Sequence, residues 1–410
     1  MNKKDLEKID KKLITDRYNS VVISIAKNKE LYLVGGYLRD LILKKRSNDR
    51  DYLIKDDIED FVGLLKKILG GSIVKFSKGG IIRLALRNNI TLDFQSLDED
   101  LKENLSKRDF TINALAWSNN KGLLDYFNCV YDVKRRIIRC ISEDNVKEDP
   151  LRIIRAYRFA GHINGKIERK TRVMLKNYKF LLGKVAGERI TSEIFNLLNL
   201  KDSYKYLKMA LDDGILSCIF YIDNNRLKNN IKGILKNERY FFNTLPKDIK
   251  VKLNKVYSQN LKYKGLLNLE TIFRGNDTED LDKNVLVLSN KLKNRIRKFL
   301  IGEKLLNLID KNKRETIFDF FNKVEDAYLD VLIVNKRLDI LSEHKYFRNS
   351  IKSKLVNEET IKVLENKYKG EELGKIIEKL RKKIYTREIS TKKQMFNYVN
   401  NILHNIHYRS

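Results

Sequence analysis

Two aspartates, Asp49 and Asp51, stand two residues apart where a strand is predicted, at DRDYLI. Because side chains alternate along a strand, this spacing places both carboxylates on one face. Two carboxylates on one face can hold Mg²⁺ through oxygen ligands alone. A Mg²⁺ ion between a triphosphate and an attacking hydroxyl is what nucleotidyl transfer requires. By itself such a pair is more often two solvated acids.

A glycine pair precedes these acids. Gly35 and Gly36 end the predicted strand LYLVGG (31–36) and open a predicted helix at 37–45. Without Cβ atoms they would let a phosphate approach the backbone at the helix N-terminus, and Arg39 could clamp that phosphate one turn later. A lone glycine pair is usually a turn, but the order strand, glycine pair, arginine and strand aspartates is much more specific.

A third carboxylate, Asp93, lies in the predicted strand ITLDF (90–94). It could accept the proton of an attacking 3′-hydroxyl. The alternative, an ordinary acid on an edge strand, stays open from spacing alone.

The run KRDFTINA (107–114) offers further ligands for a nucleotide. Arg108 could contact a phosphate, and Asp109 could accept a hydrogen bond from a ribose 2′-hydroxyl, which selects ribonucleotides. Asn113 would share a helical face with Asp109. The alternative is an ordinary helix with Asp109 as its N-cap.

The run EDPLRIIRAYR (148–158) predicts a helix with Pro150 in its first turn. Glu148 and Asp149 would then lie at the end where acids are favoured. Three arginines continue the same face at a spacing of three: Arg152, Arg155 and Arg158. Such a column could also be an ordinary salt-bridged helix face.

The elements around these motifs predict an α+β fold. Residues 1–140 mix predicted strands with helices, including a helix at 56–70 and strands at 72–76 and 81–87 joined by a hairpin turn at Lys78-Gly79-Gly80. After residue 140 the patterns become helical. We expect a small mixed sheet with helices, followed by an elongated all-helical region with boundaries near residues 205 and 285.

The composition favours a nucleic-acid partner. The 410 residues carry 84 Lys+Arg against 54 Asp+Glu, a formal net charge of +30, which attracts polyanions; a base-biased genome is the alternative explanation. We find no membrane-spanning run and no signal peptide, so we expect no membrane partner. Three cysteines without CxxC spacing favour a reducing, cytoplasmic location over a disulfide scaffold.

Four motifs in this order resemble those of the class II tRNA nucleotidyltransferases, which share a catalytic core with bacterial poly(A) polymerases: GGYLRD…DRD, SKRDFTINALA, EDPLRIIRAYRF and ERITSEI. The resemblance covers roughly residues 30–200. It implies a nucleotidyltransferase-type catalytic head (1–140), a helical neck that recognises the base (141–205), a helical body (206–285) and a basic helical tail that binds tRNA (286–410).

The resemblance also implies residue roles. Asp49 and Asp51 match the Mg²⁺ ligands, and Gly36 and Arg39 match the triphosphate contacts. Further matched positions are Arg108 and Asp109 for ribose and phosphates, Asp149 and Arg152 for reading the base, Glu148 for holding that arginine, Arg155 and Arg158 for the nucleotide, Asp125 where head meets neck, and Glu188, Arg189 and Glu193 on a supporting helix.

The implied activity is addition of C (CC, with full CCA also open) to the 3′ end of tRNA from CTP and ATP, without a nucleic-acid template. The helical half would grip the tRNA acceptor arm. Only 14 residues (94–107) separate Asp93 from Arg108, shorter than the flexible loop of CCA-completing members. This favours CC addition with a separate A-adding enzyme. The usual arginine after the third carboxylate is Gln95, and FNC replaces a glycine-rich stretch after Asp125. A poly(A) polymerase and an inactive RNA-binding protein are the alternatives.

Overall fold

The computed structural model describes residues 3–27, 29–76, 80–310 and 312–404. The chain forms two compact units, Met1–Tyr221 with Val285–Val287, and Ile222–Asn284 with Leu288–Ser410. The first unit holds a mixed sheet with helices, and the second is almost wholly helical. The predicted α+β fold is therefore confirmed, while the finer division into head, neck, body and tail stays a prediction.

A seven-stranded sheet in the first unit carries the first two motifs. Its order is β3-β4-β5-β2-β1-β6-β7, and β2 pairs with β5 in parallel while every other pair is antiparallel. The strands are β1 (Leu31–Val34), β2 (Asp49–Ile54), β3 (Ser72–Phe76), β4 (Ile81–Leu86), β5 (Ile90–Ser96), β6 (Ala116–Ser118) and β7 (Gly122–Leu124). Lys78 and Gly79 of the predicted hairpin turn lie outside the described residues, although β3 and β4 pair as expected.

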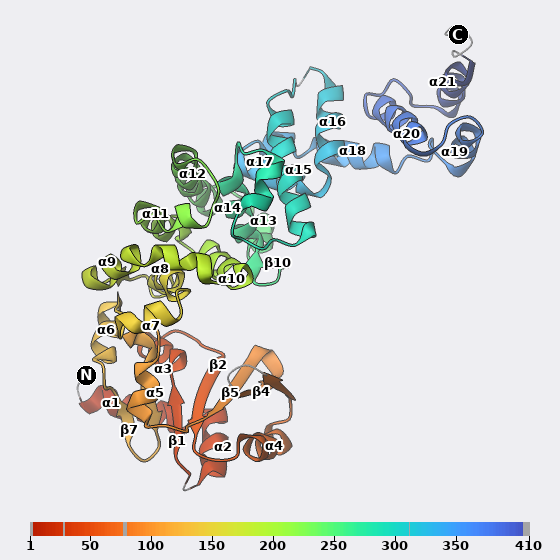
Figure 1. Ribbon diagram of the computed structural model, residues 1–410. Coiled ribbons are helices and arrows are strands. Elements are labelled where there is room, and N and C mark those ends of the chain that lie inside the picture. Colours follow the sequence, from red (N-terminus) through yellow and green to blue (C-terminus); the bar gives the residue numbers. More distant parts are fainter. Residues whose placement is uncertain (1–2, 28, 77–79, 311, 405–410) are drawn as a thin grey trace. The chain divides into compact units, whose positions relative to one another are not determined.

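Buried aromatic residues pack on one face of this sheet. Tyr52 of β2 stacks on Phe94 of β5, with ring centroids 4.9 Å apart, and Phe61 packs edge-on against Phe94 at 5.5 Å. Phe61 belongs to α4 (Ile58–Leu69), which lies beside the sheet in Figure 1. Because side chains alternate along β2, Asp49 and Asp51 lie on the opposite face.

Other helices surround the sheet. Two of them precede the first strand and are not predicted by the patterns above, α1 (Lys3–Ile14) and α2 (Arg17–Ala26). Between or after the strands of the sheet lie α3 (Gly36–Ile42), α5 (Leu101–Ser106) and α6 (Cys129–Arg135). The carboxylate of Asp125 caps α6, because it accepts hydrogen bonds from the backbone of Cys129 and Val130 at 2.7 and 3.0 Å.

Further helices follow the sheet within the first unit. They are α7 (Glu143–Glu148), α8 (Arg152–His162), α9 (Arg169–Asn177), α10 (Gly187–Leu198) and α11 (Ser203–Asp212), with a short strand pair β8 (Ile137–Ile138) and β9 (Lys166–Ile167). The prediction that Glu148 and Pro150 open one helix is wrong. Glu148 ends α7, Pro150 lies in the turn, and α8 begins only at Arg152.

The second unit has ten α-helices among its described residues. They are α12 (Asn224–Asn243), α13 (Lys247–Leu253), α14 (Tyr263–Phe273), α15 (Asn290–Leu306), α16 (Arg314–Val324), α17 (Tyr328–Val334), α18 (Glu343–Ile351), α19 (Glu358–Glu365), α20 (Gly370–Tyr385) and α21 (Lys392–His404), with the hairpin β10 (Val256–Ser258) and β11 (Leu261–Lys262). None of the helices described in either unit is long and apolar enough to span a membrane.

Candidate active site

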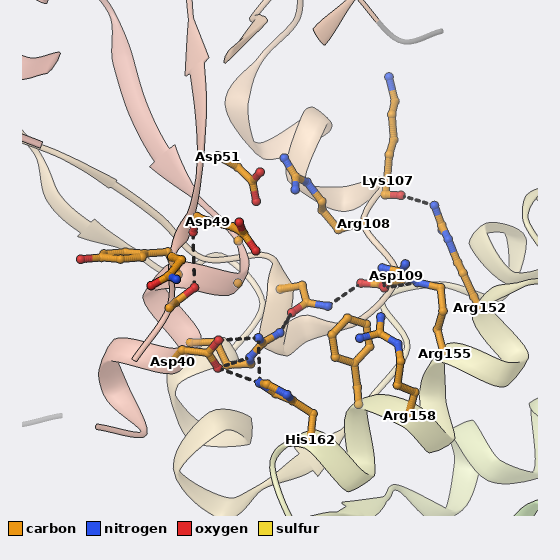
Figure 2. Close-up of a pocket in the computed structure, with 18 of the residues that line it drawn as sticks. Asp40, Asp49, Asp51, Lys107, Arg108, Asp109, Arg152, Arg155, Arg158 and His162 are labelled. Carbon is orange, nitrogen blue, oxygen red and sulfur yellow. Dashed lines mark hydrogen bonds and ion pairs between the residues drawn. The ribbon is translucent and has the colours of Figure 1, made fainter. Parts of the chain in front are cut away.

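A cavity of about 1030 Å³ lies within the first unit, between the aspartate-bearing face of the sheet and α8. That volume is at the upper end for small-molecule sites. Figure 2 shows its lining side chains converging from both sides. The structure brings twelve of the fourteen predicted site residues to this cavity: Gly35, Gly36, Arg39, Asp49, Asp51, Arg108, Asp109, Asn113, Asp149, Arg152, Arg155 and Arg158.

The other two predicted residues lie elsewhere. Asp93 lines an adjoining cavity of about 360 Å³, together with Asp51 and Arg108. Glu148 is exposed at the end of α7 and lines neither cavity. Its backbone precedes the turn at Pro150, and no ion pair joins Glu148 to Arg152 among the described residues, so the role of Glu148 in holding this arginine stays a prediction.

The carboxylates of β2 and β5 form a concentrated negative charge. Asp51 lies directly opposite Asp93 in the parallel register, and Thr91 Oγ1 donates to Asp49 Oδ1 at 2.6 Å. Burial, and then the charges of Asp93 and Asp49, raise the pKa of Asp51, whereas Arg108 lowers it. Two neighbouring carboxylates on one face supply oxygen ligands that suit a divalent cation such as Mg²⁺, with Asp49 and Asp51 as the residues that would hold it.

Asp93 has a partner that the sequence analysis missed. Arg83 Nε donates to Asp93 Oδ1 and Arg83 Nη2 donates to Asp93 Oδ2, both at 2.7 Å. Arg83 faces Asp93 across the β4–β5 pair. An arginine from the neighbouring strand thus pairs with the third carboxylate, in a chain where Gln95 replaces the arginine that the resemblance leads one to expect.

Gly35 keeps space open beside these acids. Its φ of +77° lies in the left-handed region that favours glycine. A Cβ at this position would lie 3.5 Å from both Asp51 Oδ2 and Arg108 Nη1. Any larger residue would therefore occupy the space between the backbone and these charged groups.

Arg39 is nearly buried and already paired. Its Nε and Nη2 donate to the two carboxylate oxygens of Asp40, each at 2.9 Å, and its Nη1 donates to Asn113 Oδ1 at 2.6 Å. His162 Nε2 of α8 lies 3.2 Å from Asp40 Oδ1. These contacts occupy most of the donors of Arg39, so the structure makes it a link between α3 and its neighbours more than an open phosphate clamp. Neither Asp40 nor His162 was singled out by the sequence motifs.

Asp109 does not cap a helix. The residues after it, Thr111–Asn113, form one 3₁₀ turn, and its Oδ1 accepts from the Phe110 N–H at 2.8 Å and from Asn113 Nδ2 at 2.9 Å. Its Oδ2 accepts from Arg155 Nε and Nη2 at 2.9 and 2.6 Å. Burial alone would raise the pKa of Asp109, but Arg155 and these hydrogen bonds hold it below its ordinary value. A ribose hydroxyl would therefore compete with existing donors, and the geometry gives Asp109 the role of holding Arg155.

The arginine column of α8 is partly a salt-bridged face. Glu193 of α10 accepts from Arg155 Nη1 at 3.4 Å and from Arg158 Nε at 2.5 Å. The guanidinium of Arg158 also lies 3.8 Å from the ring centroid of Phe159. The alternative of a salt-bridged helix face thus accounts for part of the pairing of Arg155 and Arg158. These ion pairs also tie α10 to α8.

Asp149 and Arg152 each leave one atom unpaired. Asp149 Oδ2 accepts from Arg189 Nη2 at 3.0 Å, and Arg152 Nη2 donates to the Lys107 carbonyl at 2.7 Å (Figure 2). Asp149 Oδ1 and Arg152 Nη1 are buried and have no hydrogen-bond partner among the described residues. Buried polar groups are nearly always hydrogen-bonded, so these two atoms are unusual. They give this wall of the cavity one acceptor and one donor that lack a partner.

Arg108 is also available to a ligand. Its guanidinium makes no hydrogen bond or ion pair within the described part of the chain, and Figure 2 shows it reaching toward Asp51. Burial lowers the pKa of Arg108, while Asp51 and Asp109 raise it; an arginine nevertheless stays charged. A charged, half-buried guanidinium that lines a cavity is suited to a phosphate group.

Known protein families match two segments of the first unit. Residues 85–139 match the family described as "Poly A polymerase head domain", and residues 165–221 match "Probable RNA and SrmB- binding site of polymerase A". A CC-adding tRNA nucleotidyltransferase of Geobacter sulfurreducens is 35% identical over 211 residues, which cover 50% of this chain and 49% of that protein. A CCA-adding enzyme of Lactobacillus delbrueckii subsp. bulgaricus is 34% identical over 205 residues, with coverages of 45% and 50%. The alignments thus span about half the length of these relatives.

The fold continues beyond the aligned half. A solved structure of a CCA-adding enzyme with CTP superposes with a TM-score of 0.74 over 97% of this chain and 98% of that chain, at 20% sequence identity. At that identity the likeness shows a shared fold. The family matches and the relatives, over about half of the chain, confirm the resemblance to tRNA nucleotidyltransferases and poly(A) polymerases that the motifs carry.

Proposed function

We propose that this chain is a tRNA nucleotidyltransferase that adds C to the tRNA 3′ end without a nucleic-acid template, as CC or as part of CCA. One observation carries the proposal. A single cavity is lined on one side by Asp49 and Asp51, and on the other by Asp149 and Arg152. Asp149 and Arg152 each have one buried atom without a hydrogen-bond partner among the described residues. Nucleotidyl transfer with base selection needs both sets of groups around one nucleotide.

The unpaired atoms match one edge of two bases. Cytosine presents an amino group beside the acceptor N3, and adenine presents an amino group beside the acceptor N1. Asp149 Oδ1 can accept from the amino group, and Arg152 Nη1 can donate to the ring nitrogen. Uracil and guanine place a carbonyl where the amino group would be, which leaves Asp149 without a donor. The chain would thus select C and A by its own side chains.

The triphosphate is assigned to the opposite side of the cavity. Arg108 has its guanidinium unpaired within the described chain, and Gly35 leaves the space beside it open. A positive charge there neutralises negative charge on the phosphates. Arg39 contributes indirectly, because it fixes Asn113, which in turn holds Asp109 and thereby Arg155.

The proposed reaction is in-line attack of the tRNA 3′-hydroxyl on the α-phosphate, with release of pyrophosphate. Mg²⁺ bound by Asp49 and Asp51 would supply charge neutralisation at the phosphates and lower the pKa of the hydroxyl. The side chains of the protein position the reactants, since phosphoryl-type transfer depends on placement and charge more than on covalent catalysis. Asp93, paired with Arg83, adjoins the same acids and stays a proposed third carboxylate.

The tRNA would be held chiefly by charge. The formal net charge of +30 suits contacts to a phosphate backbone shared by many tRNAs. We expect the acceptor arm to enter the cavity of the first unit, so that its 3′-hydroxyl reaches the acids of β2.

The short connection between Asp93 and Arg108 favours CC addition. It contains α5, capped by Asp100, which accepts from the Lys102 and Glu103 N–H groups at 2.8 and 3.4 Å. The ammonium of Lys107 pairs with Glu99 and Glu103. This segment is therefore a braced helix, and we propose that the terminal A comes from a separate enzyme.

Sizing of extension products tests the proposal. The protein is incubated with Mg²⁺ and a tRNA that ends at the discriminator base, with each labelled nucleotide alone and with CTP and ATP together. We expect two added nucleotides with CTP alone and no growth beyond them when ATP is present. Three added nucleotides indicate full CCA addition, and a long ladder with ATP alone indicates a poly(A) polymerase. Absence of any extension contradicts the proposed enzyme class.

A further inference from the structure

We propose that Asn145 is a positioning residue that holds the base-reading Arg152, and so sets the choice of nucleotide without touching the nucleotide. Asn145 lies between the motifs that carry the family resemblance and outside the cavity lining. The inference rests on the function proposed above and adds a residue to its specificity machinery.

Asn145 uses both hydrogens of its amide on one short backbone segment. It lies in α7, and its backbone N–H donates to Ser142 Oγ, the cap of that helix, at 3.1 Å. Its side-chain Nδ2 donates to the Ser106 carbonyl at 2.7 Å and to the Arg108 carbonyl at 2.8 Å. Asn145 is only 6% exposed. The side chain therefore clamps the carbonyls on either side of Lys107 from a capped helix.

The carbonyl between these two belongs to Lys107, and it holds Arg152. It accepts from Arg152 Nη2 at 2.7 Å, as Figure 2 shows. The side chain of Lys107 is paired with Glu99 and Glu103, so the backbone alone makes this contact. The segment 106–108 is thus tied to α7 at its two outer carbonyls and gives its middle carbonyl to Arg152.

The position of the unpaired Arg152 Nη1 depends on this arrangement. A hydrogen bond weakens steeply when its angle or length departs from the optimum, so reading a base edge requires a guanidinium held in one place. If the segment 106–108 shifts, Arg152 moves with it and the match to N3 of cytosine is lost. The backbone of Arg108 shifts at the same time, which weakens contact with the triphosphate.

The second unit offers a matched control. Asn230 of α12 makes the same two-carbonyl clamp, because its Nδ2 donates to the Ile272 carbonyl at 2.9 Å and to the Arg274 carbonyl at 2.8 Å. It is 8% exposed and does not line the cavity. Asn230→Asp therefore removes an equivalent pair of buried hydrogen bonds from a place that has no contact with Arg152.

The test is nucleotide binding by calorimetry, with the full chain, Mg²⁺ and no tRNA. The dissociation constants for CTP and UTP are measured for the wild type, Asn145→Asp, Asn145→Ala and Asn230→Asp. Asn145→Asp is isosteric and removes both donors, while Asn145→Ala removes them without adding a charge. We expect the CTP preference to fall by about fivefold or more in both Asn145 variants. The Asn230→Asp protein should melt at a lower temperature and keep the wild-type preference.

Each outcome is decisive. If both Asn145 variants keep the wild-type CTP-to-UTP ratio, the inference is overturned, even when their affinities for both nucleotides fall together, because that pattern indicates a purely structural residue. If the wild type itself binds CTP no better than UTP, the proposed function fails, and this is seen before any variant is compared.

Discussion

At the scale of single residues, the ionised form of Asp51 destabilises the fold but is the form that would bind a cation. It is half-buried, and burial together with the carboxylates of Asp93 and Asp49 raises its pKa. The ionised side chain is thus disfavoured in the fold, yet only the ionised form is a good ligand for a cation. Such a conflict is expected at a site that a bound metal and substrate complete, as proposed above.

The variant Asp51→Asn tests this opposition. A group whose pKa is raised by folding contributes stability below its unfolded pKa and loses it as the pH rises through the folded pKa. At pH 7 to 8 without Mg²⁺, the Asp51→Asn protein, whose side chain is neutral there, should therefore melt at a higher temperature than the wild type. We expect the same variant to lose more than about a hundredfold in tRNA extension, because a proposed metal ligand is gone. Binding of tRNA, measured by gel shift, should persist.

Asp60→Asn is the matched control, since Asp60 is an exposed acid on α4, which packs on the opposite face of the sheet. It should leave extension unchanged. Extension at the wild-type rate by the Asp51→Asn protein would contradict the assignment of Asp51 as a metal ligand.

At the scale of elements, spacing predicted the motif-bearing strands and helices but not how they pair. Alternation placed Asp49 and Asp51 on one face of a strand, and β2 carries them so. Partners distant in the chain were beyond such reasoning: Asp149 pairs with Arg189, 40 residues away, and Asn113 accepts from Arg39, 74 residues away. These contacts depend on how helices pack on the sheet, which no local pattern encodes.

The break between α7 and α8 was missed for a related reason. Pro150 is compatible with a first helical turn, so local propensity alone favoured one helix from residue 148. In the structure a turn at Pro150 separates two helices, and it brings Asp149 to the cavity while leaving Glu148 exposed. The local sequence does not distinguish a proline in the first turn of one helix from a proline in a turn between two helices.

Three helices of the second unit meet at a buried cluster of ionisable side chains, which predicts that the stability of the fold depends on pH. Glu270 of α14 is fully buried near Asp330 of α17 and Arg295 of α15; Arg295 Nε lies 3.8 Å from Glu270 Oε1 and 2.8 Å from Asp330 Oδ2. Burial, and then the charge of Asp330, raise the pKa of Glu270 well above its ordinary value, while Arg295 opposes them. Glu270 is therefore protonated in the folded protein over a wider range than in the unfolded chain.

The variant Glu270→Gln should remove that dependence. The stability due to protonated Glu270 is complete below the unfolded pKa, about 4.3, and falls as the pH rises through the folded pKa. The difference in melting temperature between Glu270→Gln and the wild type should thus increase from pH 5 to pH 8. The corresponding difference in the free energy of unfolding should rise by at most about 1.4 kcal/mol per pH unit. Calorimetric scans across this range measure it, and a difference that shrinks as the pH rises would contradict the assignment.

At the scale of the whole molecule, a strongly basic chain contains a small acidic site at Asp49 and Asp51, and we assign different roles to the two. The net charge of +30 draws polyanions to the protein without distinguishing among them. In the proposed function, selection comes from the cavity of the first unit, which Asp149 and Arg152 line together with Asp49 and Asp51. The charge was predictable from composition, and a shared site was implied by motif order. The unpaired atoms to which we assign base selection emerge only from the three-dimensional packing.

The most direct measurement of this account is the ratio of C to U incorporation by Arg152→Ala, on a tRNA ending at the discriminator base. Exposed Arg169 of α9 supplies the control, Arg169→Ala. We predict that Arg152→Ala still extends the tRNA but loses at least about tenfold of its preference for C, near the lower end of the 1–3 kcal/mol expected of a bidentate base contact. The control should keep the wild-type ratio. An undiminished preference for C in Arg152→Ala would contradict the claim that the chain itself reads the base.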